Sequence, residues 1–536
     1  MSKRVAAIGL ILFVLLVALR VAYLRRAEIV VDEFQHLHAA YLVSQGETPY
    51  VDFFEHHTPL FYYLAAPLLR LSELDFDTIL SMRYLSLGSS LATILIASWW
   101  ARRLRGPIAA ALVAALMLGD FFLFARATVL FLDVFACPFL MLSGMLLGER
   151  RRRSWKLFAS GLAMGVAILF TQKAVMAGFA PLVFFLAGWP RREGGAGGWL
   201  REIGSFAAGG AVAALALPAI LGREGLGWFF QYNVVMNLGW KARHFPTRDL
   251  AFLAVTNGAV YLLALAGAAA RLRDLWKRRF RLQPEDVPVL FLVSMAIGIF
   301  LLPVVWVEYF VPVVHFAVLV AGLFVFDFAS RFLMDGDGAA RLADGPARRT
   351  AIVLVAACGC ILLVNLLGRW LLPRHTMSAA AVTAVLGAWA ASAWGLAAAV
   401  RARSRVWAVW GLALLLAFPV VEQWDYFREQ SNDAQRARVE FVLANTGPDD
   451  PVFDGYSGYG VFRPHVYRYW FLHDEVQLML SEDELGRGVI EALERRRAPI
   501  AIVDSWSAAL PPEVQRYISE KYQPTEFPDI RVRKSR

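Results

Sequence analysis

Apolar segments of about 20 residues recur through most of the chain, and short polar stretches separate them. An α-helix of that length crosses a hydrocarbon core of about 30 Å. The pattern therefore predicts about thirteen transmembrane helices, with an all-α polytopic membrane fold as the fold class. The predicted spans are 5–24, 78–100, 107–124, 128–148, 157–172, 174–190, 202–221, 251–270, 286–305, 307–329, 350–372, 377–400 and 404–421.

Basic residues mark alternate connections between these spans. If Lys3 and Arg4 are cytoplasmic, every second connection is cytoplasmic too, and each of these is rich in arginine. They are 102–105, 150–156, 191–201, 271–281, 331–349 and 401–405. The opposite connections are mostly poor in Lys and Arg. The positive-inside rule thus predicts a cytoplasmic N-terminus and an extracytoplasmic first loop at residues 25–77.

The composition changes near residue 425. Residues 439–446 resemble a helix end, 451–455 a strand, 484–497 a helix and 499–505 a buried strand. We therefore expect a transmembrane domain at 1–424, followed by a small extracytoplasmic α/β domain at 425–536. About 100 residues are enough for a small hydrophobic core.

The overall composition excludes several classes of protein. Hydrophobic residues make up 58% of the chain, and the net charge of +10 lies in the connections, so nucleic-acid binding is not expected. The three cysteines, Cys137, Cys358 and Cys360, lie in apolar segments and form neither a disulfide framework nor a zinc pattern. A glycine-rich phosphate loop is absent from the sequence, which argues against a soluble nucleotide-sugar donor.

The first loop carries the highest density of candidate chemistry. Asp32 and Glu33 directly follow the first apolar segment, and residues 32–44 have helical spacing that ends at Gly46. Carboxylates at a water–lipid boundary under aromatic cover are desolvated, which raises their pKa and suits a general base or a metal ligand. Two solvated surface acids are the alternative. We therefore treat Asp32 and Glu33 as catalytic candidates.

Glu55, His56 and His57 have the side chains of metal ligands. Consecutive histidines point apart on regular backbone, so they are poor ligands for a single ion. The expected site for a divalent metal therefore combines Glu55 with one histidine, and we take His57 as that partner.

Several later residues should face the same side of the membrane. Asp133 is a membrane-embedded acid, and Arg126 precedes it by two helical turns, too far for easy direct contact. Lys173 lies where two spans meet with almost no loop, which suits a lipid phosphate or a snorkelling lysine.

Two further stretches belong to this set. Residues 222–250 combine aromatic side chains with Lys241, Arg243 and Arg248, which suits a sugar or lipid-phosphate contact, or a plain interfacial belt. Glu308, Tyr309 and His315 lie near the outer surface between two spans.

These motifs together resemble the C-type membrane glycosyltransferases of the protein O-mannosyltransferase and aminoarabinose transferase type. The resemblance rests on the Asp32–Glu33 pair and on a G-x-x-x-Y-x-D-F-x-E-H-x-x-P-L-x-Y run that starts at Gly46. It implies helices around a lipid-facing cavity, with the first loop as a lid. It also implies that Asp32 is the essential acid at the acceptor and that Glu55 helps to hold a metal ion.

The same resemblance defines the donor side of the site. His56 stands where the aminoarabinose transferases have a phosphate-binding lysine, and Glu308 stands where the family usually has an arginine before Tyr309. The residues expected to contact the donor or its phosphate are Lys173, Arg126, Asp133, His56 and Tyr309.

The predicted function is a glycosyltransferase of the cell envelope. It moves a sugar, mannose among the candidates, from a polyprenyl-phosphate donor to an acceptor hydroxyl on the extracytoplasmic face, with inversion. A cation stabilises the leaving phosphate and a carboxylate takes the hydroxyl proton. The acceptor, whether protein, lipid or polysaccharide, stays open.

Two other functions compete with this one. A transporter or flippase for lipid-linked sugars would place its site at the bilayer midplane between repeats. The candidate acids instead cluster at the outer surface and no internal repeat is visible, which favours the enzyme. The second alternative is a non-catalytic assembly partner, which predicts no loss of activity specific to a change at Asp32.

Overall fold

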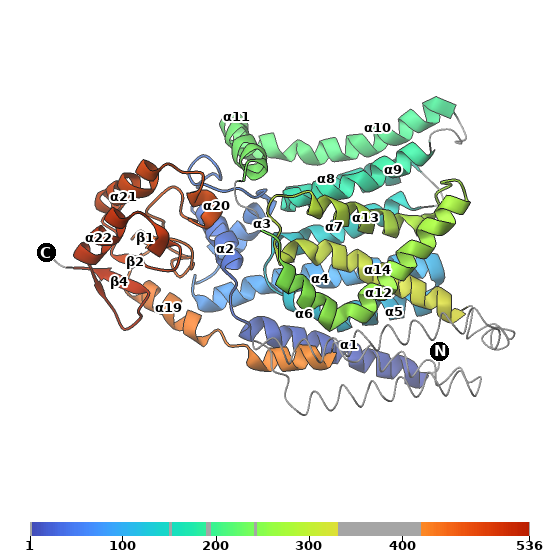
Figure 1. The fold of residues 1–536 in the computed structure, drawn as a ribbon, viewed down its shortest axis with the longest axis horizontal. Helices are drawn as coiled ribbons and strands as arrows, with labels where there is room; N and C mark the ends of the chain where they lie inside the picture. The colour runs from blue at the N-terminus through green and yellow to red at the C-terminus, as the bar shows by residue number, and fades with distance from the viewer. Residues whose placement is uncertain (1–2, 150–152, 189–194, 241–243, 331–419, 535–536) are drawn as a thin grey trace.

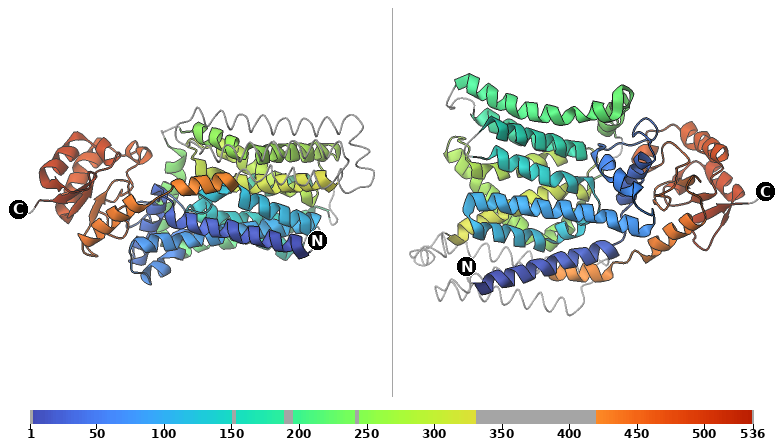
Figure 2. Two further views of the ribbon diagram at one scale, coloured as in Figure 1. Left: turned by 90° about the horizontal axis from the view of Figure 1, so that it is seen from below. Right: turned by 180° about the vertical axis from the view of Figure 1, so that it is seen from behind.

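The fold is an elongated bundle of helices with a small α/β module at one end (Figure 1). The computed structural model describes residues 3–149, 153–188, 195–240, 244–330 and 420–534. The predicted spans 350–372 and 377–400, nearly all of 404–421, and the bases Lys241 and Arg243 lie outside the described residues. Figure 2 shows the same end-to-end arrangement from below and from behind.

Apolar helices form the bundle. Each predicted span up to 307–329 overlaps at least one described helix. The bundle helices are α1 (Lys3–Arg26), α4 (Phe76–Arg105), α5 (Pro107–Gly119), α6 (Phe121–Arg126), α7 (Leu132–Leu147), α8 (Ser154–Phe170), α9 (Phe179–Gly188), α10 (Gly195–Ala214), α11 (Ala216–Phe230), α12 (Thr247–Lys277), α13 (Val287–Phe300) and α14 (Phe310–Ala329).

Length and hydropathy single out a few of these helices as complete spans. Among the described residues, α4 and Val307–Phe328 are long and apolar enough to cross a membrane, and the bent pair α10–α11 would make a third. Shorter apolar helices, including α5, α7 and α8, lie beside them. The count of about thirteen spans stays a prediction.

The span predicted at 107–124 is interrupted at Asp120. The Asp120 Oδ1 atom accepts a hydrogen bond from the Leu123 backbone N–H at 2.9 Å and so caps α6. The buried Arg20 donates to the carbonyls of Met117, Leu118 and Leu123 at 3.0–3.2 Å. A break inside an apolar bundle requires such partners, because no water is present to satisfy the freed backbone groups.

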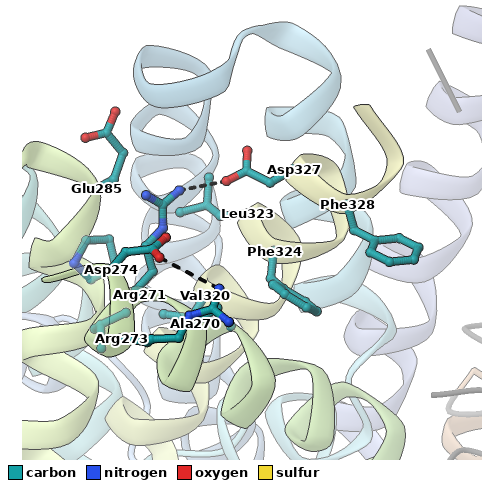
Figure 3. A pocket seen from close by; sticks show the side chains of 13 residues that line it. Ala270, Arg271, Arg273, Asp274, Glu285, Val320, Leu323, Phe324, Asp327 and Phe328 are labelled. Atoms are coloured by element: carbon teal, nitrogen blue, oxygen red, sulfur yellow. Dashed lines mark hydrogen bonds and ion pairs between the residues drawn. The ribbon is translucent and has the colours of Figure 1, made fainter. Parts of the chain in front are cut away.

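The two ends of the bundle differ in character. We call the end next to the α/β module the module end, and the opposite end the basic end. At the basic end, Arg105 pairs with Asp327 at 2.6 Å and Glu285 at 3.0 Å, and Arg271 pairs with Asp327 at 2.7 Å. Figure 3 shows the cavity beside this network, of about 100 Å³, between α12 and α14.

The first loop folds into two short helices at the module end. Helix α2 (Val31–Ser44) matches the predicted interfacial helix, and Gly46 follows it with φ of +97°, which favours glycine. Helix α3 (Leu60–Arg70) forms from a stretch of the first loop that is rich in aromatic and other apolar residues. Nearly every residue of α2 is buried, because the helix lies between the bundle and the module.

The C-terminal module contains a four-stranded sheet in the order β1-β2-β4-β3. Strands β1 and β2 are parallel, whereas β4 is antiparallel to both β2 and β3. Its elements are α19 (Asp433–Ala444), β1 (Val452–Asp454), α20 (Asp474–Gln477), α21 (Val489–Arg496), β2 (Ile500–Ile502), α22 (Pro512–Lys521), β3 (Tyr522–Pro524) and β4 (Ile530–Arg533). The two predicted helices and the two predicted strands are confirmed. Strands β3 and β4 and helices α20 and α22 were not predicted.

Candidate active site

Glu33 is held on all sides by protein atoms. Its carboxylate binds Arg83 in two hydrogen bonds, of 2.6 and 2.7 Å, and accepts the backbone N–H groups of Val30 and Leu130 at 2.9 Å. Arg83 also donates to three carbonyls around the end of α1. Both side chains are fully buried. This geometry favours a positioning role for Glu33, because its lone pairs are already used.

The neighbouring Asp32 is in the opposite situation. Its carboxylate makes no hydrogen bond or ion pair with the part of the chain that the structure describes. Burial raises the pKa of Asp32 above its ordinary value, and the nearby Lys173, His473 and Arg126 act in the opposite direction. A carboxylate that is fixed on a helix but left without a partner can accept a proton from a ligand.

Lys173 and Asp133 form the ion pair that the sequence did not predict. The Lys173 Nζ atom lies 2.7 Å from Asp133 Oδ2 and 3.5 Å from the ring centroid of Tyr309. Thr171 donates to the other Asp133 oxygen at 3.4 Å. The short 3-10 helix Gln172–Gly178 thus holds an ammonium group at the module end, with donor capacity left for a ligand.

Arg126 supplies a second cation at this end. It is the last residue of α6, and its guanidinium forms no ion pair with the described residues. Its charge acts on both Asp32 and Glu308. The structure therefore brings Asp32, Arg126 and Lys173 into one electrostatic neighbourhood.

Glu55 and the two histidines after it form a compact cluster. The Glu55 Oε1 atom accepts from His57 Nδ1 at 2.8 Å and from the backbone N–H groups of His56 and His57 at 2.9 and 3.1 Å. The two ring centroids are only 4.1 Å apart. The expectation that consecutive histidines point apart is wrong here, because residues 54–56 have neither helical nor strand structure.

This cluster fits a divalent metal ion. The ligand atoms of Glu55, His56 and His57 lie within 4.8 Å of one another. Two buried atoms, Glu55 Oε2 and His56 Nδ1, have no partner among the described residues. Burial raises the pKa of Glu55 above its ordinary value. Burial also lowers the pKa of His56 and the pKa of His57 well below the ordinary value of histidine, so both imidazoles are neutral. Carboxylate and neutral imidazole are ligands that zinc accepts.

The C-terminal module contributes residues that the sequence analysis missed. The His473 ring lies 5.5 Å from the His56 ring and 5.7 Å from Trp240, between ring centroids, and Tyr456 lies 6.3 Å away. The only sequence feature that could have indicated these residues is the His473-Asp474-Glu475 run. No local sequence pattern shows that this run packs against the first loop. Trp240 of the 222–250 connection packs against this cluster. His315 instead lies within α14, where its Nδ1 atom is hydrogen-bonded to the Val311 carbonyl.

The fold is similar to that of solved C-type membrane glycosyltransferases. Two solved structures of ArnT, an aminoarabinose transferase, from Cupriavidus metallidurans share it with a TM-score of 0.63. The structure bound to undecaprenyl phosphate is 15% identical and the apo structure 17% identical, and each match covers 99% of this chain and 98% of ArnT.

A weaker likeness extends to the oligosaccharyltransferase AglB from Archaeoglobus fulgidus, solved with an inhibitory peptide and a dolichol-phosphate. Its TM-score is 0.48 at 12% identity, over 94% of this chain and 70% of AglB. No protein-family model matches the sequence, and no curated protein matches it either. The resemblance inferred from the motifs is confirmed at the level of the fold.

Proposed function

We propose that this protein is a glycosyltransferase that moves a sugar from a polyprenyl-phosphate donor to an acceptor hydroxyl on the extracytoplasmic face. The observation that carries the proposal is the Asp32 carboxylate, which has no partner among the described residues and lies in the electrostatic field of Lys173 and Arg126. The shared fold with ArnT, one structure of which is bound to undecaprenyl phosphate, supports the same class of donor.

Lys173 and Arg126 form the donor side of the proposed site. As the bond between the anomeric carbon and the phosphate oxygen breaks, negative charge develops on the phosphate. Fixed cations in a partly dry site stabilise that charge strongly. Asp133 and Tyr309 hold the Lys173 ammonium in place. We assign His56 of the first loop to the same donor side.

Asp32 forms the acceptor side. The acceptor oxygen attacks the anomeric carbon from the face opposite the phosphate, so the reaction inverts the configuration. The hydroxyl proton passes to Asp32, and its raised pKa brings the carboxylate closer to the range of an efficient general base. Glu33, locked to Arg83, fixes the start of α2 and therefore the position of Asp32.

Glu55 with its adjacent histidines would hold a divalent ion near this site. When bound there, such an ion would supply Lewis-acid chemistry toward a phosphate group. We also propose the topology that the charge pattern predicts: about thirteen spans at 1–424, a cytoplasmic N-terminus and an extracytoplasmic module at 425–536 in the cell membrane. The sugar is a hexose or pentose, with mannose and aminoarabinose as the first candidates.

The test is sugar transfer by the purified protein in lipid nanodiscs. Undecaprenyl-phosphate donors labelled in mannose, glucose or aminoarabinose would be incubated with envelope membranes as the acceptor source. Asp32→Asn should lower transfer by about 10²–10⁴-fold, the range of a general base. Asp52→Asn is the matched control, because Asp52 is an exposed aspartate of the same loop.

Two results would overturn the proposal. Undiminished transfer by a folded Asp32→Asn protein would remove the catalytic assignment. Movement of the labelled lipid across the bilayer, without covalent transfer to any acceptor, would show a transporter instead.

A further inference from the structure

Arg20 is a fully buried arginine of α1, inside the bundle. It forms no ion pair with the described residues, and its guanidinium instead donates four hydrogen bonds to neutral oxygen atoms. A charged side chain within a membrane span is costly, so it calls for a functional explanation. Arg20 has no role in the transfer reaction described above.

The hydrogen bonds of Arg20 bridge the helix break at Asp120. Its Nη2 atom donates to the carbonyls of Met117 and Leu118, in the last turn of α5, at 3.2 and 3.0 Å. Its Nη1 atom donates to the Leu123 carbonyl of α6 at 3.0 Å and to Thr128 Oγ1, just beyond α6, at 3.1 Å. A planar guanidinium that is bonded on both sides of the break fixes the direction of α6 relative to α5.

A second side chain of α1 holds the far end of α6. The Tyr23 hydroxyl donates to the Ala125 carbonyl at 3.3 Å, and its ring centroid lies 4.5 Å from that of Phe124. Tyr23 follows Arg20 by three residues, so both side chains lie on one face of α1. Ala125 directly precedes Arg126, so the contacts of α1 reach the residue next to that cation.

Arg126 depends on this arrangement because its own guanidinium forms no ion pair with the described residues. It is the last residue of α6, which has six residues and therefore fewer than two turns. A helix this short does not keep its direction by itself. The contacts made by α1 thus set where the Arg126 charge lies.

The segment beyond α6 connects the same framework to the acceptor side. The backbone N–H of Leu130 donates to Glu33 Oε2 at 2.9 Å, and Glu33 directly follows Asp32. Only one residue separates Leu130 from Thr128, which Arg20 holds. The cation of the proposed donor side and the proposed base are therefore attached to one restrained segment.

A purely structural role would be to satisfy the carbonyls that the break frees, but other donors already serve them. Gln423 Nε2 donates to the Leu118 carbonyl at 3.0 Å and to the Asp120 carbonyl at 3.2 Å. The backbone N–H of Ala127 donates to the Leu123 carbonyl at 3.1 Å. A neutral amide is thus sufficient at the end of α5, whereas the branched guanidinium is needed to bond α5 and α6 at once.

We propose that Arg20, assisted by Tyr23, is a positioning residue that holds Arg126 at the donor phosphate. The inference rests on the proposed function, because that function places Arg126 on the donor side. Arg20 touches no substrate and acts through Arg126. A displacement of about 1 Å in such a group can lower a rate by about 100-fold.

A double-mutant cycle on phosphate binding tests the proposal. The full chain in nanodiscs would bind undecaprenyl phosphate as the probe, with affinity measured by quenching of intrinsic fluorescence. Arg126→Gln should weaken binding by about tenfold, because one fixed cation is lost. Arg20→Gln should weaken it by about fivefold, because the cation remains but is displaced. In the Arg126→Gln protein, Arg20→Gln should add less than about twofold, because no cation is left to position.

Arg463→Gln is the matched control. Arg463 is a buried arginine of the module that donates to the Thr446 hydroxyl and to backbone carbonyls, as Arg20 does in the bundle. None of its hydrogen-bond partners belongs to α5 or α6. This variant should bind undecaprenyl phosphate within about twofold of wild type.

Tyr23→Phe keeps the test informative if Arg20→Gln fails to fold. The change removes only the hydroxyl that holds the Ala125 carbonyl. It should weaken binding by about two- to threefold, the effect of one hydrogen bond, and this loss should vanish in the Arg126→Gln protein.

Two results would overturn the inference alone. One is wild-type affinity in a folded Arg20→Gln protein, or in Tyr23→Phe where Arg20→Gln does not fold. The other is an equal loss with and without Arg126, which would show that Arg20 acts on the fold in general. Wild-type affinity of Arg126→Gln would instead overturn the donor side of the proposed function, and this inference with it.

Discussion

The two ends of the bundle differ in how completely their charged side chains are paired. At the basic end, Arg105 and Arg271 share Asp327, and Arg278 pairs with Asp286 at 2.8 Å. At the module end, Asp32 and Arg126 have no ion-pair partner among the described residues. Charges that satisfy one another stabilise the fold and its orientation in the membrane, whereas charges fixed without partners are prepared for a ligand.

The same contrast separates two adjacent residues. Glu33 is fully buried, and its carboxylate is hydrogen-bonded to protein groups. Asp32, the preceding residue of α2, has no hydrogen-bond or ion-pair partner within the described chain. A chemically similar change at the two positions should therefore affect different properties. At Glu33 it should affect stability, and at Asp32 it should affect activity.

The largest effect on stability is expected for Glu33→Gln. This change leaves the buried Arg83 guanidinium without its counter-charge, which typically costs about 3–5 kcal/mol. Chemical denaturation in detergent micelles, followed by tryptophan fluorescence, would measure the loss. Asp32→Asn should change the free energy of unfolding by less than about 1 kcal/mol, and equal losses at both positions would contradict the comparison.

Acid should loosen the module from α2. His38 Nδ1 donates to the Val461 carbonyl at 2.9 Å, so its Nε2 accepts from His465 Nδ1 at 3.3 Å, and both rings are neutral. Burial lowers the pKa of His38 to about 4, against the smaller opposing effect of the Val461 hydrogen bond. The packing of the module on α2 therefore keeps its full stability above about pH 6.5. As the pH falls toward 4, the free energy of this packing decreases by up to about 3 kcal/mol.

The rate of trypsin cleavage of the module, measured after brief exposure to each pH, would test this expectation. Tyr41 and Trp470 also face the His38 ring, and neither changes its charge between pH 4 and 7. A His38→Asn variant should show a smaller change with pH, and the part that remains should come from His465, because burial also lowers the pKa of His465 well below its ordinary value. Cleavage of the wild type at a rate independent of pH would contradict the prediction.

Lys173→Met should weaken the binding of undecaprenyl phosphate by about tenfold or more, because one fixed cation is lost from the proposed phosphate site. Lys156→Met is the matched control, since Lys156 pairs with Glu149 at the basic end. Binding would be measured by quenching of intrinsic fluorescence in nanodiscs. Equal affinities for the two variants would remove Lys173 from the donor side.

The smallest effect is expected at the basic end. Arg271→Gln should lower stability by no more than about 1 kcal/mol, because Asp327 keeps Arg105 as a partner and the group is partly exposed. Sugar transfer should stay within twofold of wild type. A large loss of transfer would show that the cavity in Figure 3 matters for activity.

The sequence by itself determined the elements that depend on local patterns. Apolar runs placed the bundle helices as far as α14, helical spacing and Gly46 placed α2, and short apolar runs placed β1 and β2. Strands β3 and β4 escaped prediction because their sequences, Tyr-Gln-Pro and Ile-Arg-Val-Arg, contain no such apolar run. The residue types of the first loop also indicated where chemistry lies.

Only the tertiary structure decided which of these side chains meet. Glu33 and Arg83 lie 50 residues apart and Asp133 and Lys173 lie 40 apart, and helix packing joins each pair. Irregular backbone turns His56 and His57 to one side, and the module brings His473 against them. Sequence periodicity indicates which face of a helix or strand is buried. The pairing of side chains depends on how distant elements pack. Which polar groups have partners, and which have none, is therefore visible only in the folded chain.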